Sequence, residues 1–394
     1  YNRNISGQTY TNGTANNFAY DYDRLNRLTG ATAGNSMGET ISYDVMGNIQ
    51  SLQREGYGTT NYTGYVGNRL TETTGYHAGA FTYDANGNVK TDTRRGITDV
   101  GYNYLNLPAT VSGTANISYT YDAMGRKLRK VSSTTGTTDY VDGIQYTNGT
   151  IDFIQTGEGI ALNSGGNYTY RYNLSDLPMA IGIGNVRTSF DIYGGAVRIL
   201  QRDDYYAFGL RKSGLNGNGA VSLDNKYLYN GKELQDELGL NMYDYGARNY
   251  DPALGRWMNI DPLTEINPIF TPYHYCSDNP INRIDPTGML DGDYYDSSGA
   301  HLGSDGIIDD KAYYASSVTK NAEGIVTSAQ NKMDLGISNS VLNQLANTVA
   351  EESSGHPQES FALASSIVNL ANYKDKSISS TLQTEGIYGY GNGG

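Results

Sequence analysis

The sequence predicts a mainly β protein with a small α-rich domain at its C-terminal end, and three observations carry this prediction. The 394 residues include 49 Gly and 36 Tyr but only 9 Pro. Tyrosine favours half-buried pleated surfaces, and glycine supplies the positive-φ turns between strands. A repeat of about 20 residues fills the first third of the chain, and the hydrophobic period changes from 2 to 3.6 only near the C-terminal end.

The repeat consists of six units whose first tyrosines lie 17 to 22 residues apart. Each unit has an alternating strand that ends in Tyr-Asp or a related pair, a turn with Gly or Asn, and a second strand. Such a turn between two alternating runs predicts a β-hairpin. One unit cannot bury its own face, so we expect the hairpins to join into a continuous sheet in which Tyr and Asp are structural. The units begin at Tyr22, Tyr43, Tyr65, Tyr83, Tyr104 and Tyr121.

These units resemble the tyrosine-aspartate (YD) repeats of the RHS family, whose members wind a β-sheet spiral into a hollow shell. The resemblance implies YD/RHS repeats over residues 1–135 and further shell strands over 136–226. From Tyr227 the chain reads YLYNGKELQDELGLNMYDYGARNYDPALGRWMNIDPL and continues to PYHYCSDNPINRIDPTGM. This stretch, 227–289, is similar to the RHS repeat-associated core. In that family the core plugs the shell, and an aspartyl site then severs the C-terminal segment.

Two Asp-Pro pairs match the self-cleaving motif of that family. They are Asp261-Pro262 and, 24 positions later, Asp285-Pro286, which continues as Thr287-Gly288-Met289. The resemblance implies that Asp261 and Asp285 are catalytic and that the Met289–Leu290 bond is cut. Two carboxylates that share a site repel each other, which leaves one neutral acid and one anionic base. The base can activate a water while the acid protonates the leaving amide.

Other residues of the motif have supporting roles in this hypothesis. Gly288 permits close backbone approach at the cleaved bond, and Pro286 completes the motif. Arg256 and Arg283 lie near the aspartates in sequence and are expected to bias their protonation, although exposed arginines are common. The chain departs from the family at Met289, where leucine is usual, and at 263–265, where Leu-Thr-Glu replaces a glycine-bearing form. The alternative role for both aspartates is turn capping, since Asp-Pro often opens turns.

The chain changes character after Met289. Residues 290–394 contain 5 basic and 13 acidic residues, a net charge of −8. Residues 290–336 are predicted to be a linker or adaptor of short polar strands. Residues 337–394 are predicted to be a helical toxin domain, which is expected to continue beyond this sequence. Ser338 or Ser340 can cap its first helix, and the family resemblance implies that this position holds a variable cargo, often a toxin.

Glu352 is the candidate catalytic residue of that cargo. Helical geometry places it within the apolar stripe that includes Val341, where burial raises the pKa of a carboxyl, as a general acid for glycoside cleavage requires. The alternative is a boundary residue that reaches solvent. The run LANTVAEESSGHPQESFALASSIVNLA resembles the glutamate-bearing segment of SleB-like cell wall hydrolases. This resemblance implies that the cargo cleaves peptidoglycan, with Glu352 as its acid.

Charge and composition restrict the partners. A net charge of −13 opposes binding to nucleic acid and to anionic membranes, and no apolar run approaches the roughly 20 residues of a membrane span. His274 and His356 have no partner at metal-ligand spacing. We therefore expect no cofactor, no metal, no membrane span and no nucleic acid partner. The chain starts without methionine or signal peptide, so we expect a piece of a longer protein.

The favoured function is an RHS-type delivery shell that encloses a C-terminal toxin and releases it by aspartyl autoproteolysis after Met289. Its expected partners are its own toxin segment, an immunity protein and a secretion or delivery machinery, with peptidoglycan as a further candidate. The expected location is secreted or delivered from the surface of a bacterium that competes with others. Two alternatives remain open: a structural or adhesive cell-surface protein, and the same shell with a nuclease or another toxin as cargo.

Overall fold

In the computed structural model, one hydrogen-bond pattern closes the repeated turns. After Tyr43, Asp44 Oδ1 accepts the N–H groups of Met46 and Asn48, both at 2.8 Å. Gly47 has a φ of 84°, which glycine adopts without strain. In the turns that begin at Asp23, Asp84, Asn103 and Asp122, the Oδ1 atom of that residue likewise accepts the N–H of the residue four positions later. The acidic residue of the repeat therefore shapes the turn.

The repeat tyrosines tie each unit to the one before it. The Tyr43 hydroxyl donates to the Leu28 carbonyl at 2.7 Å, and Tyr65 reaches Ile49 at the same distance. Tyr83 and Tyr102 donate in the same way to Leu70 and Val89. The expectation that Tyr104 begins the fifth unit was wrong, because Tyr102 occupies the repeat position while Tyr104 is 79% exposed. Tyr102 precedes Asn103, whose amide replaces the aspartate and hides the pattern.

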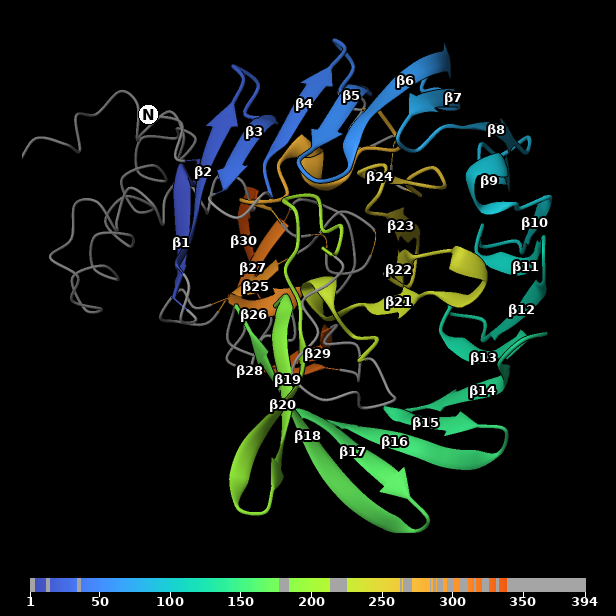
Figure 1. Cartoon of the computed structure of the whole chain (residues 1–394), viewed down its shortest axis with the longest axis vertical. Coiled ribbons are helices and arrows are strands. Elements are labelled where there is room, and N and C mark those ends of the chain that lie inside the picture. The colour runs from blue at the N-terminus through green and yellow to red at the C-terminus, as the bar shows by residue number, and fades with distance from the viewer. Residues whose placement is uncertain are drawn as a thin grey trace, which may run out of the picture. The chain divides into compact units, whose positions relative to one another are not determined.

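The structure describes residues 4–11, 15–33, 37–176, 184–212, 225–262, 264, 271–283, 285, 288, 293–295, 301–304, 311–314, 317–320, 326–330 and 333–338. Twenty consecutive antiparallel strands form two sheets, which we call the wall (Figure 1). The nine strands of the first sheet are β1 (Gly7–Thr11), β2 (Ala15–Tyr22), β3 (Leu28–Ala33), β4 (Glu39–Tyr43), β5 (Ile49–Arg54), β6 (Gly58–Val66), β7 (Arg69–Gly75), β8 (Gly79–Tyr83) and β9 (Val89–Asp92).

The second sheet of the wall follows a short 3-10 helix, η1 (Thr93–Arg95). Its eleven strands are β10 (Asp99–Tyr102), β11 (Pro108–Ser112), β12 (Asn116–Tyr121), β13 (Lys127–Ser132), β14 (Gly136–Val141), β15 (Ile144–Thr147), β16 (Thr150–Thr156), β17 (Gly159–Ser164), β18 (Asn167–Ser175), β19 (Val186–Tyr193) and β20 (Ala196–Arg202). The wall curves around a smaller four-stranded sheet (Figure 1).

That smaller sheet belongs to the core segment, residues 225–288. Its strands are β21 (Glu233–Gln235), β22 (Met242–Asp244), β23 (Asn249–Asp251) and β24 (Arg256–Trp257), and its 3-10 helices are η3 (Tyr229–Gly231), η4 (Glu237–Gly239) and η5 (Cys276–Asp278). Buried aromatic rings fill its centre, where the Tyr250 and Tyr275 rings stack 3.8 Å apart. Asn230 donates to the hydroxyls of Tyr245 and Tyr275. The tyrosine excess of the composition therefore also builds the core segment.

The chain divides into two compact units, Tyr1–Met289 and Leu290–Gly394. In the second unit the structure describes one four-stranded sheet, β26-β25-β27-β30, and a pair, β28-β29. The strands are β25 (Asp293–Tyr295), β26 (His301–Ser304), β27 (Lys311–Tyr314), β28 (Ser317–Lys320), β29 (Val326–Gln330) and β30 (Met333–Ser338). Ser338 pairs with Lys311 in this sheet and is the last residue of β30. The predicted helices beyond it lie outside the described residues.

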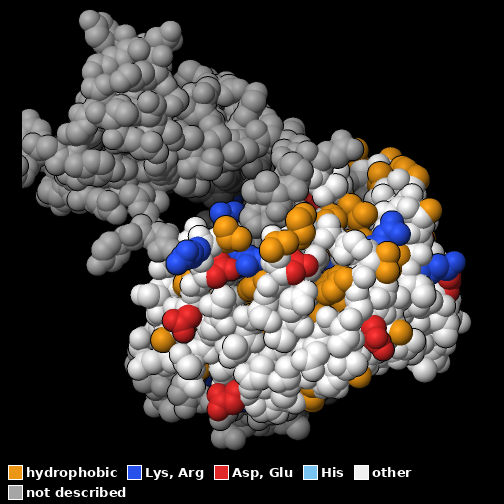
Figure 2. Space-filling view, turned by 90° about the horizontal axis from the view of Figure 1, so that it is seen from above, with side chains coloured by type: hydrophobic (Ala, Val, Ile, Leu, Met, Phe, Trp, Pro, Cys, Tyr) orange, Lys and Arg blue, Asp and Glu red, His pale blue; other side chains and the backbone are white. Residues whose placement is uncertain are grey.

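The mainly β prediction is confirmed, because the described elements are β-strands with a few 3-10 turns, and the strands pair antiparallel except for β25 with β27. Within the described residues, no helix is long and apolar enough to cross a membrane. Figure 2 shows basic and acidic side chains scattered singly or in small groups over the coloured part of one face, among neutral side chains. On this face neither sign forms a broad field.

Candidate functional site

The two aspartates of the cleavage motif are both buried in the core segment. Asp261 is 4% exposed and Asp285 is 8% exposed. The Asp261 backbone N–H donates to the Pro272 carbonyl at 3.1 Å, which fixes the backbone at Asp261. Buried carboxylates need a compensating charge or hydrogen bond. A cation or hydrogen-bond donors close to both side chains would meet this need.

Arg248 supplies that cation. Its Nη2 atom lies 2.9 Å from Asp261 Oδ2 and 3.2 Å from Asp285 Oδ2. A single nitrogen thus joins the two carboxylates, which we call the carboxylate pair. The positive charge of the guanidinium stabilises negative charge on either carboxylate and allows them to approach each other. The structure therefore brings the two aspartates together around one arginine.

Gly288 lies against the same arginine. Arg248 Nε donates to the Gly288 carbonyl at 2.6 Å, and the Gly288 N–H donates to Asp285 Oδ1 at 2.7 Å. Gly288 has a φ of 78°, and a Cβ there would lie 3.0 Å from Arg248 N and 3.2 Å from Tyr245 Cβ. Only glycine fits this conformation and space without a shift. The residue before Met289 is thus held by both partners of the site.

Arg248 is positioned by stacking and strand pairing. Its guanidinium lies over the Trp257 ring at 4.2 Å, a favourable cation–π geometry. Arg248 immediately precedes β23, and Tyr250 of that strand pairs with Trp257 of β24. Burial lowers the pKa of Arg248, while Asp261 and Asp285 oppose that effect. Its Nη1 atom is buried and has no hydrogen-bond partner among the described residues, so one donor remains for a further group.

His274 lies close to the same site. Burial lowers its pKa to about 4, its hydrogen bond to Thr271 opposes this shift, and its charge would interact with Arg248, Asp261 and Arg283. Its Nδ1 lies 2.6 Å from the Thr271 carbonyl, which requires the proton on Nδ1 when the ring is neutral. A neutral imidazole is therefore part of the surroundings of the carboxylate pair at neutral pH.

The other residues named from the sequence have different places. Arg256 donates to the Tyr65 hydroxyl and the Asn68 carbonyl of the wall, and Arg283 donates to Ser277 Oγ. The structure thus shows Arg248, and not these two arginines, in contact with the carboxylate pair. Pro286, Met289, Leu290 and Glu352 lie outside the described residues. The cleaved bond and the hydrolase candidate accordingly remain predictions.

Sequence reasoning missed Arg248, although a signal was present. Arg248 lies in a stretch rich in tyrosine, YDYGARNYD, a composition that favours a packed surface. A buried arginine requires a carboxylate partner. The nearby aspartates assigned to catalysis were the candidates for that partner. Within the described residues, no group of three or more His, Cys, Asp or Glu side chains could hold a metal ion.

No family model matches the chain, but several proteins are similar to parts of it. Salivary gland surface protein 1 of Aedes aegypti is 34% identical over 95 residues, which cover 24% of this chain and 3% of that protein. Toxin subunit YenC1 of Yersinia entomophaga is 33% identical over 98 residues, covering 25% and 10%. The tRNA3(Ser)-specific nuclease WapA of Bacillus spizizenii is 23% identical over 292 residues, covering 68% and 12%.

The fold has a counterpart among solved structures. The crystal structure of TcdB2-TccC3 matches with a TM-score of 0.50 and 17% sequence identity, over 73% of this chain and 18% of that chain. The chain thus spans about an eighth or less of the length of the three relatives above. Its fold therefore resembles that of TcdB2-TccC3, and parts of its sequence are similar to a toxin subunit and a nuclease.

Proposed function

We propose that this chain is the C-terminal part of an RHS-type delivery shell that encloses a toxin segment and frees it by aspartyl autoproteolysis after Met289. The observation that carries this proposal is the position of Arg248, which contacts Asp261, Asp285 and the Gly288 carbonyl at once. A buried pair of carboxylates beside a backbone that is fixed at Gly288 suits hydrolysis of a peptide bond close by, and Met289–Leu290 lies one residue further along the chain. Turn capping alone does not account for a buried arginine that joins two distant aspartates.

In the proposed reaction, one carboxylate removes a proton from a water molecule that adds to the Met289 carbonyl carbon. The other carboxyl donates a proton to the Leu290 nitrogen as the C–N bond breaks. The products are a carboxylate at Met289 and an amine at Leu290. Arg248 holds Gly288 and stabilises the carboxylate that is charged at each stage. Its Nη1, which has no hydrogen-bond partner among the described residues, can donate to the developing oxyanion.

Three observations support delivery over a structural or adhesive surface role. The chain is similar to a toxin subunit and to a nuclease, and its fold resembles TcdB2-TccC3. The boundary between the two compact units lies at the Met289–Leu290 bond. The match to a salivary gland surface protein favours the surface alternative, but that role requires no carboxylate pair.

The cleavage step is tested by three single variants followed on denaturing gels and by intact mass. Asp261→Asn and Asp285→Asn should each slow formation of the fragment that begins at Leu290 by about 100-fold or more. Arg248→Lys keeps the charge but loses the planar fork, so we expect cleavage about 10- to 100-fold slower. Arg283→Lys, which changes an arginine outside the pair, is the control and should cut at the parental rate. Unchanged cleavage in either asparagine variant would overturn the proposal.

For the cargo, we propose a peptidoglycan hydrolase with Glu352 as its general acid. Only the sequence resemblance supports this, and none of the relatives described above is a cell wall hydrolase. The nuclease relative favours the alternative of a nuclease cargo. Both cargoes would call for an immunity protein in the producing bacterium and for a delivery machinery that carries the shell out of the cell.

The two candidate cargoes are distinguished by the substrate that the chain cleaves. The parental chain and Glu352→Gln are each incubated with purified peptidoglycan and with total tRNA. Release of soluble muropeptides by the parent alone supports the hydrolase, whereas cleavage of tRNA by both chains supports a nuclease. Muropeptide release by Glu352→Gln at the parental rate would remove Glu352 from the site.

A further inference from the structure

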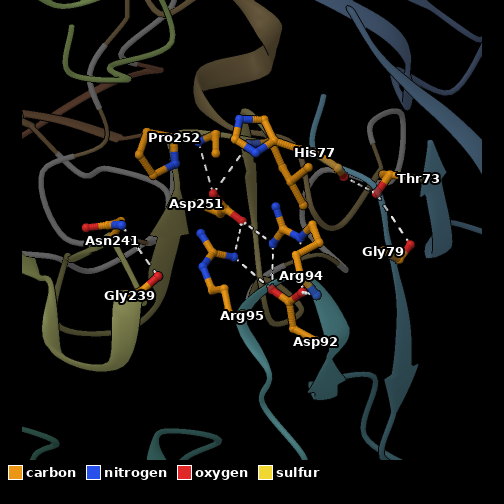
Figure 3. Close-up of polar contacts among 12 residues, drawn as sticks. Thr73, His77, Gly79, Asp92, Arg94, Arg95, Gly239, Asn241, Asp251 and Pro252 are labelled. Atoms are coloured by element: carbon orange, nitrogen blue, oxygen red, sulfur yellow. Dashed lines mark hydrogen bonds and ion pairs between the residues drawn. The ribbon is translucent and has the colours of Figure 1, made fainter. Parts of the chain in front are cut away.

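The turn between β23 and β24, residues 251–255, is held by side chains of the wall. Asp251 Oδ2 accepts Arg94 Nη2 and Arg95 Nη1, both at 2.7 Å, and all three side chains are buried (Figure 3). The same two arginines also bind Asp92 at 2.6 and 2.8 Å. The other oxygen of Asp251 accepts the N–H groups of Ala253 and Leu254 and closes the turn. We call residues 251–255 the wall-bound turn.

Two further wall residues bind the backbone of this turn. Arg54, at the end of β5, donates to the Pro252 and Ala253 carbonyls, both at 2.8 Å. The Tyr62 hydroxyl of β6 donates to the Leu254 carbonyl at 2.7 Å. Three consecutive carbonyls and the preceding carboxylate are therefore all bound by side chains from β5, β6 and η1. The wall and η1 thus bind both the side chain and the backbone of this short turn.

The wall-bound turn is the closed end of the β23–β24 hairpin, and Arg248 adjoins the open end of that hairpin. Arg248 immediately precedes β23 at the open end, and Trp257, whose ring supports the Arg248 guanidinium, ends β24. Two residue pairs, Asp251 with Arg256 and Tyr250 with Trp257, connect the two ends. A shift of the turn would therefore move the ring beneath Arg248. Coupling of this kind travels through a rigid element that both ends share.

We infer that Arg54, Arg94 and Arg95 are positioning residues for autoproteolysis: by binding the wall-bound turn they place Arg248 between Asp261 and Asp285, so that cleavage depends on seating of this hairpin against the wall. The inference rests on the proposed cleavage function. It gives the wall a role in the timing of release, because a hairpin that is not bound to the wall does not place Arg248 between the two carboxylates. A toxin segment would then be severed only from a chain whose wall has formed around the core segment.

The experiment compares cleavage rates in cell-free translation, where the uncut chain can be followed from its synthesis. The double variant Arg94→Gln/Arg95→Gln should cut about 3- to 30-fold more slowly than the parent, the range expected for coupling through a shared element. Arg94→Lys/Arg95→Lys keeps the charges near Asp251 and should recover part of that loss. The matched control is Lys130→Gln. Lys130 is another buried wall cation, but it binds Glu237 of η4 at 2.5 Å instead of the wall-bound turn.

Trp257 provides a second readout that does not depend on cleavage. It is the single tryptophan of the chain, is buried, and lies directly beneath Arg248. In an uncut Asp285→Asn background, the Arg94→Gln/Arg95→Gln change should shift Trp257 emission to the red while circular dichroism retains the β spectrum. Lys130→Gln should leave the emission unchanged. Circular dichroism shows whether the variant is folded, so the two spectra together distinguish a moved hairpin from a loss of folding.

The outcomes separate the two proposals. If the parent and Asp285→Asn are equally uncut, the proposed cleavage fails, and the emission of Trp257 still decides whether the wall positions the hairpin. If the parent cuts but the Arg94/Arg95 double variant cuts at the same rate with unchanged emission, the positioning inference alone is overturned. Equal slowing by Lys130→Gln would also overturn it, because the effect would then be a general loss of stability.

Discussion

Asp278 is a buried carboxyl in a left-handed turn of the core segment. It is 1% exposed, and its Oδ2 atom has no hydrogen-bond partner among the described residues. Burial raises the pKa of Asp278 well above its usual value, and Arg27 only partly opposes this. Cys276, Ser277 and Asp278 all have φ between 50° and 60°, which Asn and Asp tolerate better than most residues. The position thus suits a neutral amide better than a carboxylate.

Asp278→Asn should stabilise the protein at neutral pH. Because the folded pKa of Asp278 is raised, its protonated form contributes stability at low pH that is lost as the pH rises from about 4 toward the folded pKa. The asparagine variant has no such loss. We expect it to gain about 1–3 kcal/mol relative to the parent at pH 7, and little at pH 4. Urea unfolding at the two pH values measures this, and an equal difference at both would contradict it.

At the residue scale, sequence spacing indicated the aspartates but not their cation. The motif named Asp261 and Asp285, and in the structure both contact the same nitrogen. Arg256 and Arg283 were chosen because they are near in sequence. Their side chains instead bind the wall and Ser277. The position of Arg248 depends on the pairing of β23 with β24 and on the Trp257 ring, and no spacing rule expresses these tertiary contacts.

The repeated turns of the wall form hydrogen bonds with the core segment. Tyr273 donates to the Gly87 carbonyl, Arg256 to Asn68 and Asn279 to Asn26. Each acceptor lies in a turn of the wall, so one row of turn carbonyls forms much of the contact with the core segment. The sequence predicted the hairpins because turn residues and alternation are local signals. It did not predict this contact, because the acceptors are backbone atoms common to every turn.

Gly87 should be sensitive to substitution because of both its conformation and its neighbours. Its φ is 85°, and a Cβ would lie 2.3 Å from Ile260 Cδ1 in the core segment. Gly67, at a φ of 60° in another turn, has nothing within 4 Å of such an atom. Gly67→Ala therefore measures the backbone strain alone, which we expect to cost about 1 kcal/mol. Gly87→Ala should cost about 2–4 kcal/mol because it adds the clash.

Chemical denaturation of both alanine variants, under identical conditions, checks this difference. The comparison isolates the contact between one wall turn and the core segment from the left-handed conformation that both turns share. Equal losses in the two variants would show that Ile260 can move aside at no cost, and that the turn does not hold the core segment.

At the scale of the first compact unit, the fold class was predictable from the composition and the repeat. The contacts that join the wall to the core segment were not predictable. Buried and half-buried ion pairs make that junction: Arg94 and Arg95 with Asp251, Lys127 with Glu233 and Asp244, and Lys130 with Glu237. Partners more than 90 residues apart in sequence have no local signature. The net charge of −13 gave no indication that the buried charges would be so closely paired.

The charges at this junction also determine how the unit responds to acid. Burial is the largest effect on Glu233 and raises its pKa, but Lys127 and Lys130 outweigh it and lower that pKa to about 2. The stabilisation by Glu233 is therefore lost only as the pH falls below about 4.5. Burial lowers the pKa values of His77 and His274 to about 4. As the pH falls from 6.5 to 4.5, the histidines therefore lower the stability of the folded unit before the paired carboxylates do.

His274 should make the unit acid-sensitive in that window. Its folded pKa of about 4 lies below the unfolded value of 6.5, so the unfolded chain binds a proton first and stability falls as the pH drops through this range. At pH 5 this amounts to about 2 kcal/mol. His274→Gln can still donate to the Thr271 carbonyl but does not titrate. We expect the parent to lose about 2 kcal/mol more than this variant between pH 7 and pH 5, by urea unfolding. The comparison cancels the opposing effect of Asp278, which both chains share, and parallel losses would show that His274 is charged in the folded protein.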